Sequence, residues 1–128
     1  MSDSKNHSDW MERAQHDLIS ARQLLEDEGY TDTIGYLLHQ ALEKALKASL
    51  LQLNDCYPKT HDLVNLVSLL TKQKKNFEDY LEDCQFVNSF YVDGRYPADL
   101  SGMPSYEEMK KALKIVENIF DLIVKEIS

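Results

Sequence analysis

Residues 31–53, which read TDTIGYLLHQALEKALKASLLQL, set the architecture of this chain. Apolar residues recur in them at intervals of three and four, the spacing of one face of an α-helix: Ile34, Leu38, Ala41, Ala45 and Ala48. At about 100° per residue, further leucines widen this face to well over half of the circumference: Leu37, Leu42, Leu46, Leu51 and Leu53. So broadly apolar a helix must be covered on several sides, and we expect it in the middle of a bundle, or also against a second subunit.

Four further helices are predicted around this central one. The first runs from about residue 8, where Ser8 can cap it, to about residue 28, and Gly29 stops it. Thr60 is expected to cap a short helix over residues 61–71. Another helix is expected over residues 76–91, with an inner face of Phe77, Leu81, Cys84, Val87 and Tyr91.

The last helix follows a segment, residues 92–104, that is too rich in Gly and Pro for one regular element. Ser105 and Glu108 form a capping box that opens a helix to about residue 126, whose inner face begins at Tyr106. No stretch has the pattern of a strand. The sequence therefore predicts an all-α protein, an antiparallel bundle of four or five helices. Residues 1–7 are expected to be a disordered tail and residues 8–128 a single helical domain.

Composition excludes several classes of function. The chain has 128 residues and a net charge of −8, and so acidic a protein repels polyanions, which argues against broad nucleic-acid or membrane binding. A local basic patch could still accept one nucleotide or a short RNA.

Cys56 and Cys84 fit no disulfide framework and indicate free thiols. With no apolar run near 18 residues and a polar N-terminus, the chain is expected to be cytoplasmic.

One polar stripe lies opposite the apolar face of the central helix. His39, Glu43 and Lys47 stand at i, i+4 and i+8, with Tyr36 and Gln40 beside them and Lys44 at the edge. The stripe is either one wall of a site or a solvated face with a stabilising Glu43–Lys47 pair. His39 and Glu43 could form half of a metal site, but no second ligand pair is found, so no metal is predicted.

Two other segments could bind an anion. Thr60-His61-Asp62-Leu63 begins a helix, where free N–H groups and the helix dipole suit phosphate, or where Thr60 and Asp62 simply cap. Gly94-Arg95-Tyr96-Pro97 places an arginine in a loop, from which Arg95 could grip phosphate or carboxylate, or form a structural ion pair.

Together these segments resemble the HEPN family, the higher-eukaryote and prokaryote nucleotide-binding domain. The resemblance runs from about residue 10 to about residue 125 and includes residues 39–48, HQALEKALKA, residues 58–63, PKTHDL, and residues 95–97, RYP. The core over residues 40–48 and the segment over residues 60–63 are together fairly specific, whereas either one alone would be weak. It implies an antiparallel helical bundle, commonly a homodimer, often encoded beside a minimal nucleotidyltransferase in a toxin–antitoxin-like pair. It also implies a cleft lined by Lys47, His61 and Arg95, with Glu43 and Lys44 nearby.

The sequence departs from the ribonuclease members of that family, which carry an arginine followed by a histidine after four to six residues. The last histidine here is His61, so none follows Arg95. Arg13 lies too close to the next histidine and Arg22 too far from it. Metal-independent ribonuclease activity is therefore the disfavoured alternative, and an interaction-only dimeric module is another.

The favoured interpretation is a nucleotide- or phosphate-binding partner of a nucleotidyltransferase, without a catalytic residue, metal or cofactor of its own. The predicted binding residues are Lys47, His61, Arg95, Lys44, Glu43, His39, Gln40, Thr60 and Tyr96.

Overall fold

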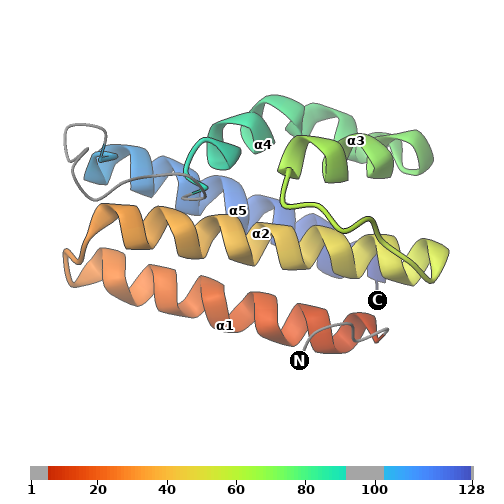
Figure 1. Cartoon of the computed structure of the whole chain (residues 1–128), viewed down its shortest axis with the longest axis horizontal. Helices are drawn as coiled ribbons and strands as arrows, with labels where there is room; N and C mark the ends of the chain where they lie inside the picture. Colours follow the sequence, from red (N-terminus) through yellow and green to blue (C-terminus); the bar gives the residue numbers. More distant parts are fainter. Residues whose placement is uncertain (1–5, 92–102, 128) are drawn as a thin grey trace.

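The computed structural model describes residues 6–91 and 103–127, and all regular structure in those ranges is helical (Figure 1). The predicted all-α bundle is therefore confirmed. Its elements in chain order are α1 (His7–Glu26), α2 (Thr31–Asn54), α3 (Leu63–Gln73), the 3₁₀ helix η1 (Lys75–Tyr80), α4 (Leu81–Asn88) and α5 (Tyr106–Ile127). No helix in the described ranges has the length and apolar character needed to cross a bilayer.

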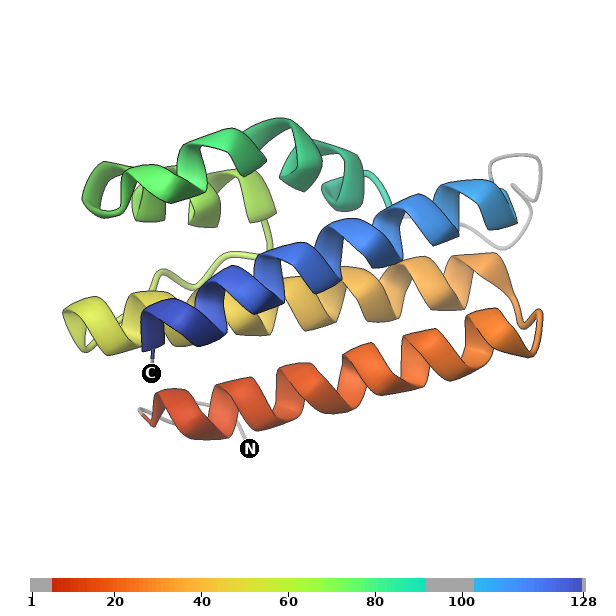
Figure 2. The same ribbon diagram turned by 180° about the vertical axis from the view of Figure 1, so that it is seen from behind.

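Helix α2 is the centre of the molecule. It lies between α1 and α5, while α3 and α4 cross above α2 and α5 (Figures 1 and 2). Its residues from Leu38 to Leu51 are buried almost without interruption, apart from the half-buried Gln40 and Lys44. The expectation that this helix is covered on several sides is confirmed.

The turn between α1 and α2 shows why a glycine is needed there. The backbone N–H of Gly29 donates to Leu24 O over 2.7 Å, directly after Glu28 with a φ of 54°. A Cβ on Gly29 would lie 2.8 Å from Leu24 Cδ2 and 3.2 Å from Leu24 O, so a larger residue would push the turn off the helix. The hydroxyl of Tyr106 donates to the carbonyls of Glu28 and Gly29, which joins the start of α5 to this turn.

Two of the predicted helix starts are wrong by two residues. Asn6, not Ser8, caps α1, and its side chain accepts from Ser8 N over 2.9 Å. Asp62, not Thr60, caps α3, because its carboxylate reaches Val64 N at 3.0 Å. Thr60 Oγ accepts instead from Asp62 N and shapes the approach to the helix. In the first case a side chain of equal capping ability takes the position, and in the second a side chain of greater capping ability.

The predicted helix over 76–91 is in fact two elements, η1 and α4. Phe77, Cys84 and Val87 are buried as expected, but Leu81 is 39% exposed. A 3₁₀ helix advances about 120° per residue instead of about 100°, so Leu81 is rotated off the face that Phe77 occupies.

At the last helix the capping box is confirmed: Ser105 N donates to Glu108 Oε1 and Glu108 N to Ser105 Oγ. Tyr106 is exposed rather than part of the inner face.

Candidate functional site

The polar stripe of α2 is buried. His39 is 0% exposed, Glu43 4% and Lys47 6%, although the bundle offers ample surface for charged groups. Ionisable side chains are seldom buried unless they are paired. The interpretation as a solvated face is therefore wrong, and the stripe lies under other parts of the chain.

Glu43 is the centre of this buried group. Lys47 Nζ, one turn further along α2, donates to Glu43 Oε2 over 3.0 Å. His61, from the connector between α2 and α3, donates through Nδ1 and lies 3.1 Å from both carboxylate oxygens. His39 Nδ1 lies 3.8 Å from Glu43 Oε1 on the other side. We call these four residues the Glu43 cluster.

Lys47 is enclosed by aromatic rings as well as by its carboxylate partner. Its ammonium lies 5.9 Å from the ring centre of Trp10 and 5.5 Å from that of Tyr57. The two rings meet edge to face at 5.1 Å. A cation over ring faces gains electrostatic attraction where water is excluded. Lys47 therefore acts as an internal counter-ion of Glu43.

His61 is the open member of the cluster. Its side chain is 60% exposed although Nδ1 is held by Glu43. A histidine whose Nδ1–H binds a carboxylate has a fixed ring orientation and presents Nε2 to its surroundings. The geometry thus offers one oriented imidazole nitrogen outside a buried ionic pair.

Asn88, at the end of α4, ties the cluster to α3. Its Oδ1 accepts from Leu63 N at 3.0 Å and from His39 Nε2 at 3.3 Å, while its Nδ2 donates to Asp62 Oδ1 at 3.2 Å. Sequence reasoning missed this residue. Asparagines are common near helix ends, and Asn88 stands at no helical or motif spacing from His39 or Leu63, so nothing in the sequence signalled these contacts.

Burial lowers the pKa of His39, and the Glu43 carboxylate and the Asn88 hydrogen bond oppose that shift without reversing it. Since Asn88 Oδ1 can only accept, the proton of neutral His39 lies on Nε2. His39 Nδ1 makes no hydrogen bond within the described part of the chain. The cluster therefore combines a buried neutral histidine with an exposed one.

Tyr91 covers the two histidines. Its ring centre lies 4.6 Å from that of His39 and 5.3 Å from that of His61, nearly parallel to His61 at 18°. Tyr36, also predicted beside the stripe, stacks on Tyr91 at 6.5 Å. Tyr91 is the last described residue before the segment that holds Arg95 and Tyr96, so those two predicted contacts lie outside the described residues.

The remaining predicted residues lie apart from this centre or play supporting parts. Lys44 pairs with Asp17 of α1 at 2.6 Å, on a different side of α2 from the cluster. Gln40 is half-buried. At the start of α3, the N–H groups of Leu63 and Val64 are already bound by Asn88 and Asp62. Side chains therefore occupy the first two N–H groups of the helix, and the exposed side chain of this segment within the cluster is that of His61.

No group of three or more metal-ligating side chains is found among the described residues. The arrangement is that of a helical bundle with an internal ion pair and one oriented surface histidine.

Comparison with known proteins identifies the class. The family model described as HEPN domain matches residues 7–127, so the chain belongs to the HEPN family. The resemblance found in the sequence is thereby confirmed. Comparison with curated proteins gives no match.

Two solved structures share the fold. One is TT1696 from Thermus thermophilus, with 24% sequence identity, a TM-score of 0.81, and coverage of 95% of this chain and 98% of that one. The other is ST0689, described as an archaeal HEPN homologue, with 22% identity, a TM-score of 0.77, and coverage of 98% of this chain and 100% of that one. The likeness extends over nearly the whole of all three chains.

Proposed function

We propose that this HEPN domain binds a nucleotide, and that His61 contacts a phosphate group of it. The observation that carries the proposal is the exposed imidazole of His61, held by a buried carboxylate at 3.1 Å. An imidazolium in this position donates to Glu43 through Nδ1 and to an anion through Nε2. Because its ring is already oriented, His61 loses little conformational freedom when a ligand binds.

The charges of the cluster support an anionic ligand. Glu43 and Lys47 neutralise one another, so a protonated His61 leaves the group with a net positive charge. Arg95 and Tyr96, predicted from the sequence, are proposed as further contacts from the segment that follows Tyr91. In this arrangement Lys47 supports the site from within by neutralising Glu43.

Membership of the HEPN family supports a second part of the proposal. Small members of this kind are expected beside a minimal nucleotidyltransferase, and we propose that such a protein is the partner in a toxin–antitoxin-like pair. Coexpression of the two proteins followed by purification on a tag of one of them tests this part. A nucleotidyltransferase that elutes without the HEPN chain contradicts it.

The nucleotide proposal is tested by calorimetric titration of the purified protein with ATP. His61→Ala and Arg95→Ala should each weaken binding by about tenfold or more, as expected for a charge-assisted hydrogen bond worth about 1.5–3 kcal/mol. His16→Ala and Arg13→Ala are matched controls, since both residues are exposed on α1. Equal affinities of all four variants for ATP would overturn the proposal. The absence of any heat of binding when ATP is added to the unmodified protein would overturn it as well.

A second candidate, metal-independent RNA cleavage, is favoured by the His61–Glu43 pair, because a histidine oriented by a carboxylate can act as a general base. The missing arginine–histidine spacing weighs against it. Incubating RNA with the protein in a chelating buffer decides the question. Cleavage that His61→Ala abolishes would establish an enzyme, and an intact RNA ladder would remove this candidate.

A further inference from the structure

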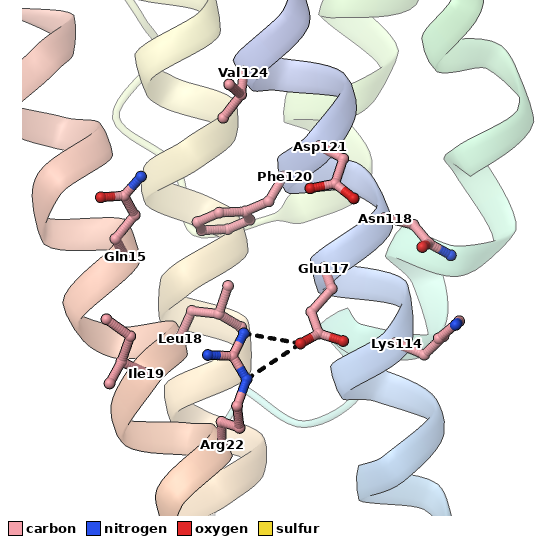
Figure 3. A pocket seen from close by; sticks show the side chains of 10 residues that line it. All are labelled: Gln15, Leu18, Ile19, Arg22, Lys114, Glu117, Asn118, Phe120, Asp121 and Val124. Carbon is pink, nitrogen blue, oxygen red and sulfur yellow. Dashed lines mark hydrogen bonds and ion pairs between the residues drawn. The ribbon is translucent and has the colours of Figure 1, made fainter.

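The Glu43 cluster differs from the ion pairs on the surface of the bundle. In the open groove between α1 and α5, Arg22 donates to Glu117 over 2.8 Å, and both side chains are more than a third exposed (Figure 3). Water and salt screen a pair of this kind, so its charges can change at little cost. In the cluster, one carboxylate faces three basic side chains, and two of these, His39 and Lys47, are buried. A change of charge there is costly unless another charge balances it.

His39 has one ring nitrogen that is placed to accept a proton. Its Nε2–H donates to Asn88 Oδ1, so the lone pair of the neutral ring lies on Nδ1. This Nδ1 is buried, has no hydrogen-bond partner within residues 6–91 and 103–127, and lies 3.8 Å from Glu43 Oε1. A lone pair that faces a carboxylate oxygen is unfavourable, whereas an N–H in the same place donates to it. A proton on Nδ1 would therefore give this buried nitrogen a partner.

In the free protein, the other charges of the cluster oppose that proton. Lys47 and Glu43 cancel one another, so a protonated His61 leaves the cluster with one positive charge. A proton on His39 would make two, around a ring that is fully buried. Burial lowers the pKa of His39, and the charge of His61 adds to this effect, while Glu43, Asn88 and the main chain of His61 act against it. The free protein therefore keeps His39 neutral near pH 7.

The other described groups that pack on His39 bring no charge directly against the ring. Tyr91 covers it at a distance of 4.6 Å between ring centres, and a phenol is uncharged near neutral pH. Asn88 of α4 is a neutral amide, and Asp62 lies one hydrogen bond further away, behind Asn88. Protonation of Nδ1 is therefore controlled by the carboxylate, by His61 and by any ligand that binds to His61.

An anion at His61 changes this balance of charge. A terminal phosphate group carries about two negative charges at neutral pH, and the phosphate of a diester carries one. A diester therefore cancels the single positive charge of the cluster. A terminal phosphate leaves one negative charge over, and a proton on His39 is the charge that would cancel it.

We propose that the site selects a terminal phosphate, a phosphomonoester, and that its binding brings a proton from the solvent to Nδ1 of His39, where the new N–H donates to Glu43. This inference rests on the proposed contact between His61 and a phosphate, and it adds a class of ligand and a second, buried proton acceptor. No covalent bond of the ligand changes, and the cluster gains one positive charge. His39 does not touch the ligand and acts on it through Glu43 and His61.

The number of protons taken up on binding tests the role of His39. Calorimetric titration with ATP at about pH 7.5, where the terminal phosphate is already ionised, gives this number when two buffers with different heats of ionisation are compared. The wild type should take up about half a proton more than His39→Gln, or a larger excess. Glutamine keeps an N–H donor for Asn88 but cannot take up a proton. His16→Gln, the same change at an exposed position on α1, should match the wild type.

The class of ligand is tested with AMP and cyclic AMP, which share base and ribose but carry a monoester and a diester. AMP should bind to the wild type about tenfold more tightly or better, and His39→Gln should lose most of this preference. Long-range nitrogen–proton NMR spectra of the wild type need no variant. They should show protons on both ring nitrogens of His39 with AMP bound, and on Nε2 alone without it.

The outcomes separate this inference from the proposed function. If neither ATP nor AMP binds, both are overturned. If ATP binds but the wild type and His39→Gln take up equal numbers of protons, nucleotide binding stands and this inference is overturned. Equal affinities of the wild type for AMP and cyclic AMP, or a His39 ring whose Nδ1 stays without a proton in the AMP complex, overturn it in the same way. Circular dichroism checks that His39→Gln is folded.

Discussion

The buried carboxylate of Glu43 contacts two basic side chains. Lys47 donates to this carboxylate over 3.0 Å and His61 over 3.1 Å. A buried pair of this kind gains little over an apolar pair of the same size, but the loss of one partner leaves an uncompensated charge. At the level of single residues, the cluster is therefore tightly interdependent.

Glu43→Ala should destabilise the fold by about 3–5 kcal/mol, because it leaves Lys47 buried without its carboxylate. Urea unfolding followed by circular dichroism measures the change. Glu107→Ala is the matched control, since it removes the carboxylate of an exposed pair with Lys110. Surface pairs are worth about 0–1 kcal/mol. Similar losses in both variants would contradict the role given to Glu43.

Protonation of His39 should make stability depend on pH. Its pKa in the folded chain lies below the ordinary value of 6.5 because burial disfavours the charged ring. Between the folded pKa and 6.5 the unfolded chain binds more protons, so the free energy of unfolding falls as the pH is lowered through this window. Urea unfolding from about pH 5 to about pH 7.5 should show this slope, and His39→Gln should reduce it. An unchanged slope in the variant would assign the effect to other groups.

Among the helices, Asn88 joins the end of α4 to the start of α3. It binds Leu63 N and Asp62 with the two ends of one amide and holds His39 with the same oxygen. The connector that carries His61 therefore ends at the start of α3, which α4 holds in place through Asn88. This arrangement limits how far His61 can move from Glu43.

Asn88→Ala should cost about 1–3 kcal/mol, because it leaves a partly buried backbone N–H without its acceptor. Thermal or urea unfolding measures the loss. The exposed Asn65 of α3 offers the control, and Asn65→Ala should change stability by less than about 0.5 kcal/mol. Equal stability of the two variants would show that the hydrogen bond from Leu63 N to Asn88 does not stabilise the fold.

In the molecule as a whole, α2 is the helix on which the other helices pack. One side of it carries the Glu43 cluster, which His61 of the 55–62 connector contacts, and its other sides pack against α1 and α5. A central helix that is buried on nearly every side gives the Glu43 cluster rigid support.

Local patterns along the chain were enough to predict the helical class, the central place of α2, the capping box of α5 and the family. These features depend on periodicity and on contacts between residues a few positions apart, which a linear pattern records directly. Two helix starts were predicted two residues away from where they lie, because other capping residues stand close by: Asn6 caps as well as Ser8 does, and Asp62 caps better than Thr60.

The role of the polar stripe, by contrast, depends on how the helices pack. The spacing of His39, Glu43 and Lys47 fits a solvated face as well as a buried cluster, and the difference lies in the connector and the aromatic rings that cover it. His61 reaches Glu43 from 18 residues away along the chain, and Asn88 reaches His39 from 49. Contacts over such separations leave no trace in a local sequence pattern. Only the packing of the chain shows that Glu43 and Lys47 form a buried ion pair on α2, and that the exposed His61 of the connector joins it.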